Sequence, residues 1–352
     1  MEFKVSTLNE FSNNVLMTAG VPSLEADIIT RTMIEADSRG IHSHGLMRLP
    51  IYIERMQKGF IRKESKITVE KENKGTAVID GHFSAGQVVA TKAMDMTIEK
   101  ANEYGIAAVS VKNSNHFGIA AHYALKAAQK DMIAIVMSNT APLMPPTGGA
   151  EKVLGNNPLA IAAPSSGNNP LLLDMALSNV ALGKVLFAKN NGVQIPEGWG
   201  TDKNGIPTTD PASVLDGGFI LPVGGPKGFG LALMVELLTG VLSGGDFSKM
   251  IPSMYDTTKK QSISHLMIAI NISSFMDVNT FKDLSETLGL YVKNALKAPG
   301  VSQLYLPGEI EFGVEEKRLK SGIPISDGVL EDLEKLANSM NIAPLTEGNI
   351  II

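Results

Sequence analysis

The stretch that decides the fold class is GQVVATKAMDMTIEKANEYG, residues 86–105, followed at once by IAAVSVKNS, residues 106–114. In the first segment apolar residues recur at helical spacing and Gly105 ends the pattern, whereas the second is short and apolar, as expected of a buried strand. Two β-branched runs precede this pair, KITVEKE at 66–72 and TAVIDG at 76–81. A helix enclosed between strands predicts an α/β protein.

The same alternation continues toward the C-terminus. Further strands are expected at IAIVMSNTA (133–141), LAIAAP (159–164) and LLLDMA (171–176), the first of them after the helical AAHYALKAAQKD (120–131). Later helices are expected at 228–245, 279–300 and 329–340, after a loop-rich stretch from Pro196 to Gly225. The strands therefore cluster in the middle of the chain.

The first sixty residues have the pattern of helices. The three segments are STLNEFSNNVLMTAGVP (6–22), SLEADIITRTMIEADSRG (23–40) and LPIYIERMQKG (49–59). Thr7 with Glu10 three residues later predicts a capping box at the start of the first helix. We expect a helical N-terminal region.

Composition excludes several classes of function. The 352 residues carry a formal net charge of −5 and no cysteine. An acidic chain provides no overall basic field for nucleic acid, and without cysteine there is no thiolate nucleophile, iron–sulfur cluster or cysteine zinc site. No apolar run reaches the roughly 20 residues that span a bilayer, and the N-terminus lacks a targeting pattern. We therefore expect a soluble, cytoplasmic protein that binds neither nucleic acid, membrane nor metal.

A glycine-rich turn before an apolar helix is a candidate anion site. The sequence contains neither G-x-G-x-x-G after a strand nor a P-loop, which disfavours a standard Rossmann or P-loop site. It does contain LPVGGPKGFGLALMVELLTG at 221–240, where glycines and Lys227 precede a long helical pattern. Backbone N–H groups at such a helix start favour a phosphate. A tight turn into a buried helix explains the same residues.

The stretch IHSHG at 41–45 admits three interpretations. A metal site needs at least a third ligand, and the two histidines could instead cap the preceding helix. The third interpretation joins His44 to Arg48 and Tyr52, which share one face if a helix begins near Gly45. Arg48 could then hold a carboxylate through its planar guanidinium. This is a site for a small organic acid.

His116, in NSNHFG, follows one predicted strand and precedes a predicted helix. Strand ends of this kind are where α/β proteins commonly place ligands, and a histidine can exchange a proton near neutral pH. A buried structural histidine is an equal alternative. We assign His122, within the helical pattern, to packing.

These motifs in this order resemble the malate/L-lactate dehydrogenase family that is unrelated to the Rossmann-type enzymes of the same names. The resemblance covers nearly the whole chain. The segments that carry it are RGIHSHGLMRLPIYIERMQKG (39–59), NSNHFGIAAHYA (113–124), GGAEKVLGNNPLAIAAP (148–164), LLLDMA, TDKNGIPTTDP (201–211), LPVGGPKGFGLALMVELLTGVLSG (221–244) and YLPGEIE (305–311). One departure lies in SISHLMIAINISSF (262–275), which keeps His265 and Asn271 but has Ile272 where many members have proline.

The resemblance implies an NAD-dependent oxidoreductase, with NADP as the other possible cofactor, that forms a homodimer. It implies a non-Rossmann, largely antiparallel mixed sheet for the cofactor. By position, His116 is similar to the family's general base and Arg48 to its carboxylate clamp, while Ser43, His44 and Tyr52 match its other active-site positions. Some members are described with the His44 equivalent as proton donor, so the assignment between the two histidines stays open. The implied cofactor-binding residues are Thr140, Asp174, Met175, Ala176, Gly224, Gly225, Pro226, Lys227, Pro307, Gly308 and Glu309.

Four parts of the chain are expected. They are a helical N-terminal region at 1–65 that packs with a C-terminal helix at 318–352, an α/β catalytic part at 66–122, a cofactor-binding domain at 123–300 and a C-terminal return segment at 301–352. The expected reaction interconverts a small 2-hydroxy acid and its 2-oxo acid, as in malate or lactate dehydrogenases. Ureidoglycolate dehydrogenase and cyclic-imine acid reductase are the alternatives within the family. The stretch SMYD (253–256) and Thr140 are similar to ureidoglycolate dehydrogenases. A nucleotide-binding protein without catalytic activity is a fourth possibility.

Overall fold

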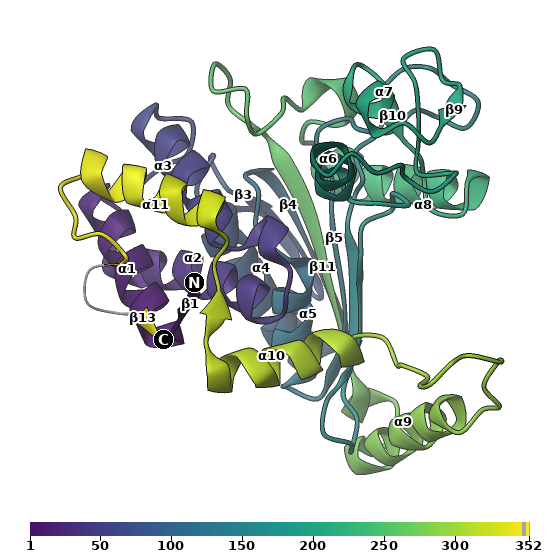
Figure 1. The fold of residues 1–352 in the computed structure, drawn as a ribbon. Helices are drawn as coiled ribbons and strands as arrows, with labels where there is room; N and C mark the ends of the chain where they lie inside the picture. The colour runs from purple at the N-terminus through teal and green to yellow at the C-terminus, as the bar shows by residue number, and fades with distance from the viewer. Residues whose placement is uncertain (347–349, 352) are drawn as a thin grey trace.

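A seven-stranded sheet with the strand order β2-β3-β4-β11-β5-β6-β7 lies at the centre of the molecule (Figure 1). The computed structural model describes residues 1–346 and 350–351. The strands are β2 (Thr68–Asn73), β3 (Thr76–Asp80), β4 (Ile106–Ser114), β5 (Met132–Ser138), β6 (Leu159–Ala163), β7 (Leu171–Met175) and β11 (Ile263–Asn271). The β3–β4 pair is parallel, and every other neighbouring pair is antiparallel. The prediction of a largely antiparallel mixed sheet is confirmed.

Two helices rich in small residues cover one face of this sheet. They are α4 (Gly86–Tyr104), which packs on β4 and β11, and α5 (Ala120–Ala128), which packs on β5 and β6. Alanines buried along α5 bring its backbone close to the strands, and the helix packs into the main hydrophobic core. This packing fixes the segment between β4 and α5, which carries His116.

The N-terminal helices form a second hydrophobic core with a helix from the end of the chain. These elements are α1 (Val5–Thr18), α2 (Ser23–Ser38), the 3-10 turns η1 (His42–His44) and η2 (Leu46–Arg48), α3 (Leu49–Gln57) and α11 (Asp327–Ser339). Figure 1 shows α11 lying beside this group. The predicted capping box at Thr7 and Glu10 is wrong, because α1 already begins at Val5 and its N-cap residue is Lys4. The short strand β1 (Glu2–Phe3), which pairs with β12 (Ile323–Pro324), leads directly into that helix.

The C-terminal residues 318–352 do not form the single helix that was expected. Helix α10 (Glu309–Ser321) ends at Gly322, whose positive φ of 103° breaks the helical path, and β12 separates it from α11. A last strand, β13 (Ile350–Ile351), also pairs with β1. Residues 347–349 and 352 of the predicted helix lie outside the described residues.

The loop-rich stretch at 196–225 contains more structure than its sequence indicates. The short strands β8 (Gly200–Thr201), β9 (Pro207–Thr208) and β10 (Phe219–Ile220) form a small sheet of their own. Helix α7 (Pro211–Leu215) packs on these strands. The remaining elements of this half of the chain are α6 (Leu182–Asn190), α8 (Pro226–Glu236), the π-helical turn η3 (Leu237–Val241), η4 (Ser248–Met250), η5 (Ile272–Ser274) and α9 (Val278–Lys293).

Strands from two of the predicted parts share the central sheet. Strand β4 precedes the predicted boundary at residue 122 and β5 follows it, and both pair with β11. The division into four parts stays a prediction. Among the described residues, none of the helices has the length and hydrophobicity that crossing a bilayer requires.

Candidate active site

Two histidines and a tyrosine meet at the end of strand β4. The Nδ1 atom of His116 is 2.6 Å from the hydroxyl oxygen of Tyr52, which α3 provides. The rings of His116 and His44 stack with their centroids 5.2 Å apart. The structure therefore brings together residues that lie more than sixty positions apart in the sequence.

Arg48 faces this cluster from the N-terminal end of α3. Its Nε donates to the carbonyl oxygen of Ser43 at 2.6 Å. Its Nη1 donates to the hydroxyl of Tyr255 and, at 3.6 Å, to the sulfur of Met254. A guanidinium held in one orientation presents a planar set of donors, which is the geometry that binds a carboxylate.

Ser43 holds the second histidine. Its Oγ lies 2.9 Å from His44 Nδ1, within hydrogen-bond distance. This leaves the Nε2 atom of His44 for another partner. The five active-site residues inferred from the resemblance, Ser43, His44, Arg48, Tyr52 and His116, therefore converge, although their roles stay proposals.

The local geometry behind this convergence differs from the prediction. The sequence interpretation places His44, Arg48 and Tyr52 on one face of a helix that begins near Gly45, but α3 begins at Leu49. His44 and Arg48 lie instead on the successive 3-10 turns η1 and η2. Gly45 lies between the two turns. A side chain has no room at this position, since a Cβ there would lie 2.1 Å from the Asp37 carboxyl carbon.

Burial and positive charge keep both histidines neutral at physiological pH. Burial, and after it the Arg48 guanidinium, lowers the pKa of His44 to about 4. Burial lowers the pKa of His116 well below its usual range, and electrostatic interactions with His44 and with the Arg48 guanidinium lower it further. A neutral imidazole can accept a proton from a substrate hydroxyl. Burial raises the pKa of Tyr52, which stays a phenol.

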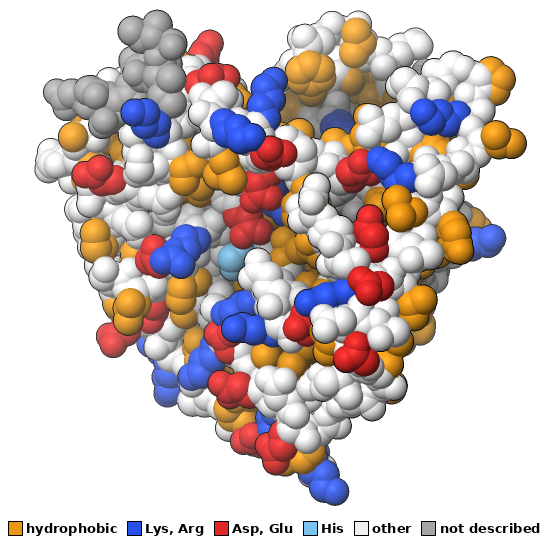
Figure 2. Space-filling model, turned by 90° about the horizontal axis from the view of Figure 1, so that it is seen from below, with side chains coloured by type: hydrophobic (Ala, Val, Ile, Leu, Met, Phe, Trp, Pro, Cys, Tyr) orange, Lys and Arg blue, Asp and Glu red, His pale blue; other side chains and the backbone are white. Residues whose placement is uncertain are grey.

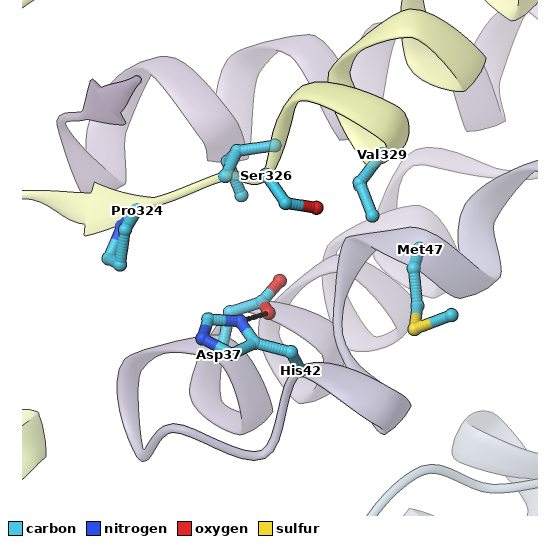
Figure 3. Close-up of a pocket in the computed structure, with 7 residues that line it drawn as sticks. Asp37, His42, Met47, Pro324, Ser326 and Val329 are labelled. Carbon is cyan, nitrogen blue, oxygen red and sulfur yellow. Dashed lines mark hydrogen bonds and ion pairs between the residues drawn. The ribbon is translucent and has the colours of Figure 1, made fainter. Parts of the chain in front are cut away.

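His42 belongs to a different pocket. Its Nδ1 lies 2.8 Å from Asp37 Oδ1, and Figure 3 shows this pair on one wall of a cavity of about 270 Å³. The other wall is formed by residues at the start of α11, including Ser326 and Val329. The two histidines of the H-x-H motif therefore have separate partners, Asp37 for His42 and Ser43 for His44.

His265 supports the cluster from behind. It is fully buried on β11 between the hydroxyls of Ser138 and Ser114, at 2.9 and 2.8 Å. Its ring stacks on Phe117 at a centroid distance of 4.4 Å, and Phe117 follows His116 directly. The sequence shows only that His265 is present. From the central strand β11, the His265 ring packs against Phe117 and so supports the segment that carries His116.

Three of the inferred cofactor segments, residues 174–176, 224–227 and 307–309, lie along strand β7 or next to residues just after it. Leu172 N–H donates to the carbonyl of Pro307 at 3.2 Å, and a Cβ on Gly308 would lie 2.9 Å from Leu172. Just after β7, the carbonyl oxygen of Leu177 accepts from the N–H of Val223, in the turn before α8, at 3.0 Å. Asp174, Met175 and Ala176 lie between these two contacts.

Residues 224–227 form an open turn at the start of α8, which we call the glycine cradle. Gly224 and Gly225 have φ of 62° and 63°, and the space around them is open. Gly225 is the N-cap and provides no side chain to the free N–H groups of the helix, which begins at Pro226 beside the exposed Lys227. Unpaired N–H groups next to a lysine suit an anion such as a dinucleotide phosphate.

Thr140 is fixed by a network around a buried carboxylate. Its N–H donates to Asn157 Oδ1 at 3.1 Å, and Asn157 Nδ2 donates to Glu236 Oε2 at 2.7 Å. Glu236, at the end of α8, also accepts from Ser248 N–H at 2.8 Å. One helix therefore has the glycine cradle at its beginning and the support of Thr140 at its end.

Two acidic residues of the inferred set have local partners. Asp174 accepts from Ala121 N–H, at the start of α5, at 3.2 Å. Burial raises the pKa of Asp174 to about 6. Glu309 accepts from Leu306 N–H and forms an ion pair with Lys293, so its carboxylate stabilises the start of α10.

Sequence reasoning gave no role to Arg55 and Tyr255. Tyr255 contacts Arg48 from a loop that is 207 positions away in the sequence. The stretch SMYD contained the signal, but a single sequence does not show which loop reaches the site.

Comparison with known proteins gives the family. The malate/L-lactate dehydrogenase family matches residues 3–334. The chain belongs to this family. It is 42% identical to a malate dehydrogenase of Pyrococcus abyssi over 345 residues, covering 96% of this chain and 94% of the relative. It is 37% identical to a ureidoglycolate dehydrogenase (NAD⁺) of Escherichia coli strain K12, covering 95% of each.

A solved structure agrees over the same length. The sulfolactate dehydrogenase of Methanocaldococcus jannaschii superimposes with a TM-score of 0.92 at 39% identity, covering 97% of this chain and 98% of the other. The resemblance and the fold class expected from the sequence are both confirmed. The relatives carry the names of dehydrogenases that act on different 2-hydroxy acids.

Proposed function

We propose that this protein is an NAD(P)-dependent dehydrogenase that interconverts a small 2-hydroxy acid and its 2-oxo acid. The observation that supports the proposal is the cluster in which Arg48 lies beside the stacked histidines His44 and His116. A substrate of this class has a carboxylate next to the carbon that carries the reacting hydroxyl. The cluster offers a cation for the first group and a neutral base for the second.

Arg48 binds the carboxylate in this proposal. Ser43 accepts from Nε, and Tyr255 and Met254 accept from Nη1, so the orientation of the guanidinium is set before substrate arrives. Its remaining donors can pair with the carboxylate. Holding the acid at C1 places C2 and its hydroxyl at a defined distance from the imidazoles.

His116 handles the proton. In the oxidation direction its Nδ1–H donates to the Tyr52 oxygen, and the bare Nε2 accepts the proton of the substrate hydroxyl. In the reverse direction the imidazolium returns that proton to the oxo group. His44 is the alternative acid or base, because Ser43 contacts its Nδ1 atom and leaves its Nε2 atom for the substrate.

The cofactor segments suit a nicotinamide dinucleotide. The glycine cradle at 224–227 would hold phosphate, and Thr140, residues 174–176 and residues 307–309 would line the remainder. When bound, the nicotinamide exchanges a hydride with C2 of the acid. We infer NAD, with NADP as the alternative.

For the substrate we propose a malate- or lactate-like acid. Ureidoglycolate is the second candidate, favoured by the Tyr255 hydroxyl at Arg48, since Tyr255 lies in the SMYD stretch that resembles ureidoglycolate dehydrogenases. Reduction of a cyclic imine acid would use the same carboxylate clamp with nitrogen in place of oxygen.

The test is absorbance at the reduced-nicotinamide band with purified protein. The panel pairs NADH or NADPH with oxaloacetate, pyruvate, sulfopyruvate and a cyclic imine acid, and NAD with ureidoglycolate. We expect turnover with one of the 2-oxo acids. Activity confined to the imine would replace the proposal, and cofactor binding without turnover of any acid would favour a non-catalytic nucleotide-binding protein.

We also propose that the protein is a homodimer through α8 and η3. Seven aliphatic side chains of this segment are more than a third exposed, namely Leu231, Leu233, Met234, Leu237, Leu238, Val241 and Leu242. On the face seen from below, which is not the face of α8, hydrophobic side chains are dispersed among charged ones (Figure 2). A contiguous apolar surface such as that of α8 and η3 marks an interface on a soluble enzyme, and a second copy is the partner that the resemblance implies.

A further inference from the structure

Arg55 is a buried arginine whose side-chain hydrogen bonds all go to one loop. It is 1% exposed. Nη1 donates to the carbonyls of Met254 and Asp256, both at 3.0 Å, and Nη2 donates to the carbonyl of Lys259 at 3.1 Å. Within the described residues its guanidinium therefore meets main-chain oxygens of residues 254–259, which we call the Tyr255 loop.

The Tyr255 loop reaches the substrate site at its other side. Met254 and Tyr255 are the residues whose side chains accept from Arg48 Nη1. The Arg48 guanidinium also lies over the Tyr255 ring, 5.8 Å from the centroid. The same short loop thus contacts Arg55 through its backbone and Arg48 through its side chains.

All these contacts are made by residues of α3 and of the turn that precedes it. Tyr52 and Arg55 are three positions apart on α3, which places them on one side of that helix, and Arg48 ends the 3-10 turn that leads into it. Arg48 faces the acid site, Tyr52 holds His116, and Arg55 holds the loop. A change at Arg55 can therefore reach Arg48 without touching the histidines.

A guanidinium is a costly way to fill a buried space. An apolar side chain of similar volume would avoid removing a charge from water. What an apolar side chain cannot do is fix several carbonyl groups at once, for which the planar five-donor guanidinium is suited. Its contribution is therefore the position of the loop.

We propose that Arg55 is a positioning residue that sets substrate affinity by holding the Tyr255 loop against Arg48. This inference rests on the proposed function, in which Arg48 binds the substrate carboxylate. Among the described residues, the hydrogen bonds of Arg55 go to the Tyr255 loop and none goes to the histidines or to the inferred cofactor segments. Its effect should fall on the acid and leave the cofactor unchanged.

The first test compares Arg55→Lys with Lys58→Met. Lysine cannot reach three carbonyls in two directions, so we expect Arg55→Lys to raise KM for the oxo acid about tenfold or more, with kcat within about threefold and NADH affinity unchanged. Lys58 contacts the same loop from solvent, through Thr257 Oγ1 at 2.6 Å, and is 45% exposed. Its variant should keep the wild-type KM.

Limited trypsin digestion tests the hold on the loop without any assay of turnover. Lys259 and Lys260 are exposed in or beside the loop. We expect faster cleavage there in Arg55→Lys than in wild type or Lys58→Met. If wild-type protein binds NADH but turns over no acid, the proposed function fails, whereas this digestion still decides whether Arg55 holds the loop.

A double-mutant cycle separates positioning from general stability. Tyr255→Phe removes the exposed hydroxyl that contacts Arg48, so it should raise KM while leaving the fold intact. If Arg55 acts through Tyr255, adding Arg55→Lys to Tyr255→Phe should raise KM by less than the product of the two single effects. A purely structural arginine would give independent effects.

Two results would overturn the proposal. One is a wild-type KM in Tyr255→Phe, which can be measured even if Arg55→Lys does not fold. The other is an Arg55→Lys variant that folds with unchanged KM and unchanged trypsin sensitivity.

Discussion

At the scale of single residues, the charge and burial around the two histidines determine what the site can do. His116 and His44 are neutral because burial and Arg48 oppose their protonation. Two stacked neutral imidazoles do not repel each other, and either one can accept a proton from the substrate. This is why the geometry alone leaves the acid/base assignment between them open, as the sequence did.

The lowered pKa of His116 predicts an unusual pH profile. The base must be unprotonated to accept the hydroxyl proton, so activity is lost only when pH falls through its folded-state pKa. We therefore expect kcat/KM for hydroxy-acid oxidation to stay flat from about pH 7.5 down to about 6.5, the ordinary histidine pKa. A half-maximal point at or above pH 6.5 would contradict the assignment.

Arg48→Lys tests the carboxylate clamp. An ammonium group provides the charge but not the planar pair of donors, so KM for the acid should rise about tenfold or more while kcat changes little. Steady-state kinetics with a 2-oxo acid provides the measurement. A similar loss with an analogue that lacks the carboxylate would show that Arg48 acts in some other way.

At the scale of elements, the turn between η1 and η2 depends on a glycine. Gly45 has no room for a Cβ beside the Asp37 carboxylate, which accepts from Leu46 N–H at 2.7 Å. We expect Gly45→Ala to lower the free energy of unfolding by about 1–3 kcal/mol, as overpacking typically does. Urea denaturation measures it.

Gly183→Ala is the matched control. Gly183 lies in α6 with open space around the Cβ position and no positive φ. Alanine is favoured over glycine in a helix by about 1 kcal/mol, so this variant should be unchanged or slightly more stable. If Gly45→Ala is as stable as Gly183→Ala, the clash at Gly45 is relieved at no cost and the prediction is wrong.

Helices with clear periodicity could be predicted from the sequence, and contacts between remote segments could not. The segment at 86–105 became α4, and the 329–340 pattern became α11, because each has a regular apolar face. The helix predicted at 49–59 became α3, which begins at Leu49 with Pro50 in its first turn, so the start near Gly45 that would place His44, Arg48 and Tyr52 on one helical face does not occur.

The central strand β11 shows most clearly what could not be predicted from the sequence. No strand was predicted for ISHLMIAIN at 263–271, yet it became β11, between β4 and β5. Its apolar run is a usable local signal, but its place in the sheet depends on pairing with strands more than a hundred residues earlier. The contact of Tyr52 with His116 is of the same kind, and only the family resemblance pointed to it.

At the scale of the whole molecule, buried histidines link stability to pH. Burial lowers the pKa of His44 to about 4 and of His265 to about 3, and lowers that of His116 as well. Below about pH 6.5 the unfolded chain takes up these protons while the folded chain does not. Stability contributed by these groups is therefore lost as pH falls.

One carboxyl opposes this trend. The pKa of Asp174 is raised to about 6, so the folded chain binds its proton before the unfolded chain does and gains stability as pH falls below about 6. Three histidines outweigh one carboxyl, and we expect a lower free energy of unfolding at pH 5 than at pH 7. Denaturation at the two pH values checks this, and equal stability would contradict it.

The proposed dimer can be tested by charge. Leu238→Glu places a carboxylate within the exposed apolar surface of α8 and η3, and we expect it to convert a dimer into a monomer in light scattering after gel filtration. Leu319→Glu, at an exposed leucine of α10, should leave the dimer intact. A monomeric wild type would contradict the assembly proposal.

The most direct test of the central claim is the oxidation of reduced nicotinamide by wild type and His116→Ala in the same assay, with cofactor binding measured for both. The account predicts that wild type reduces a 2-oxo acid, and that the variant binds NADH or NADPH equally well but turns over about 10²–10⁴ times more slowly. Undiminished turnover in His116→Ala would contradict the account.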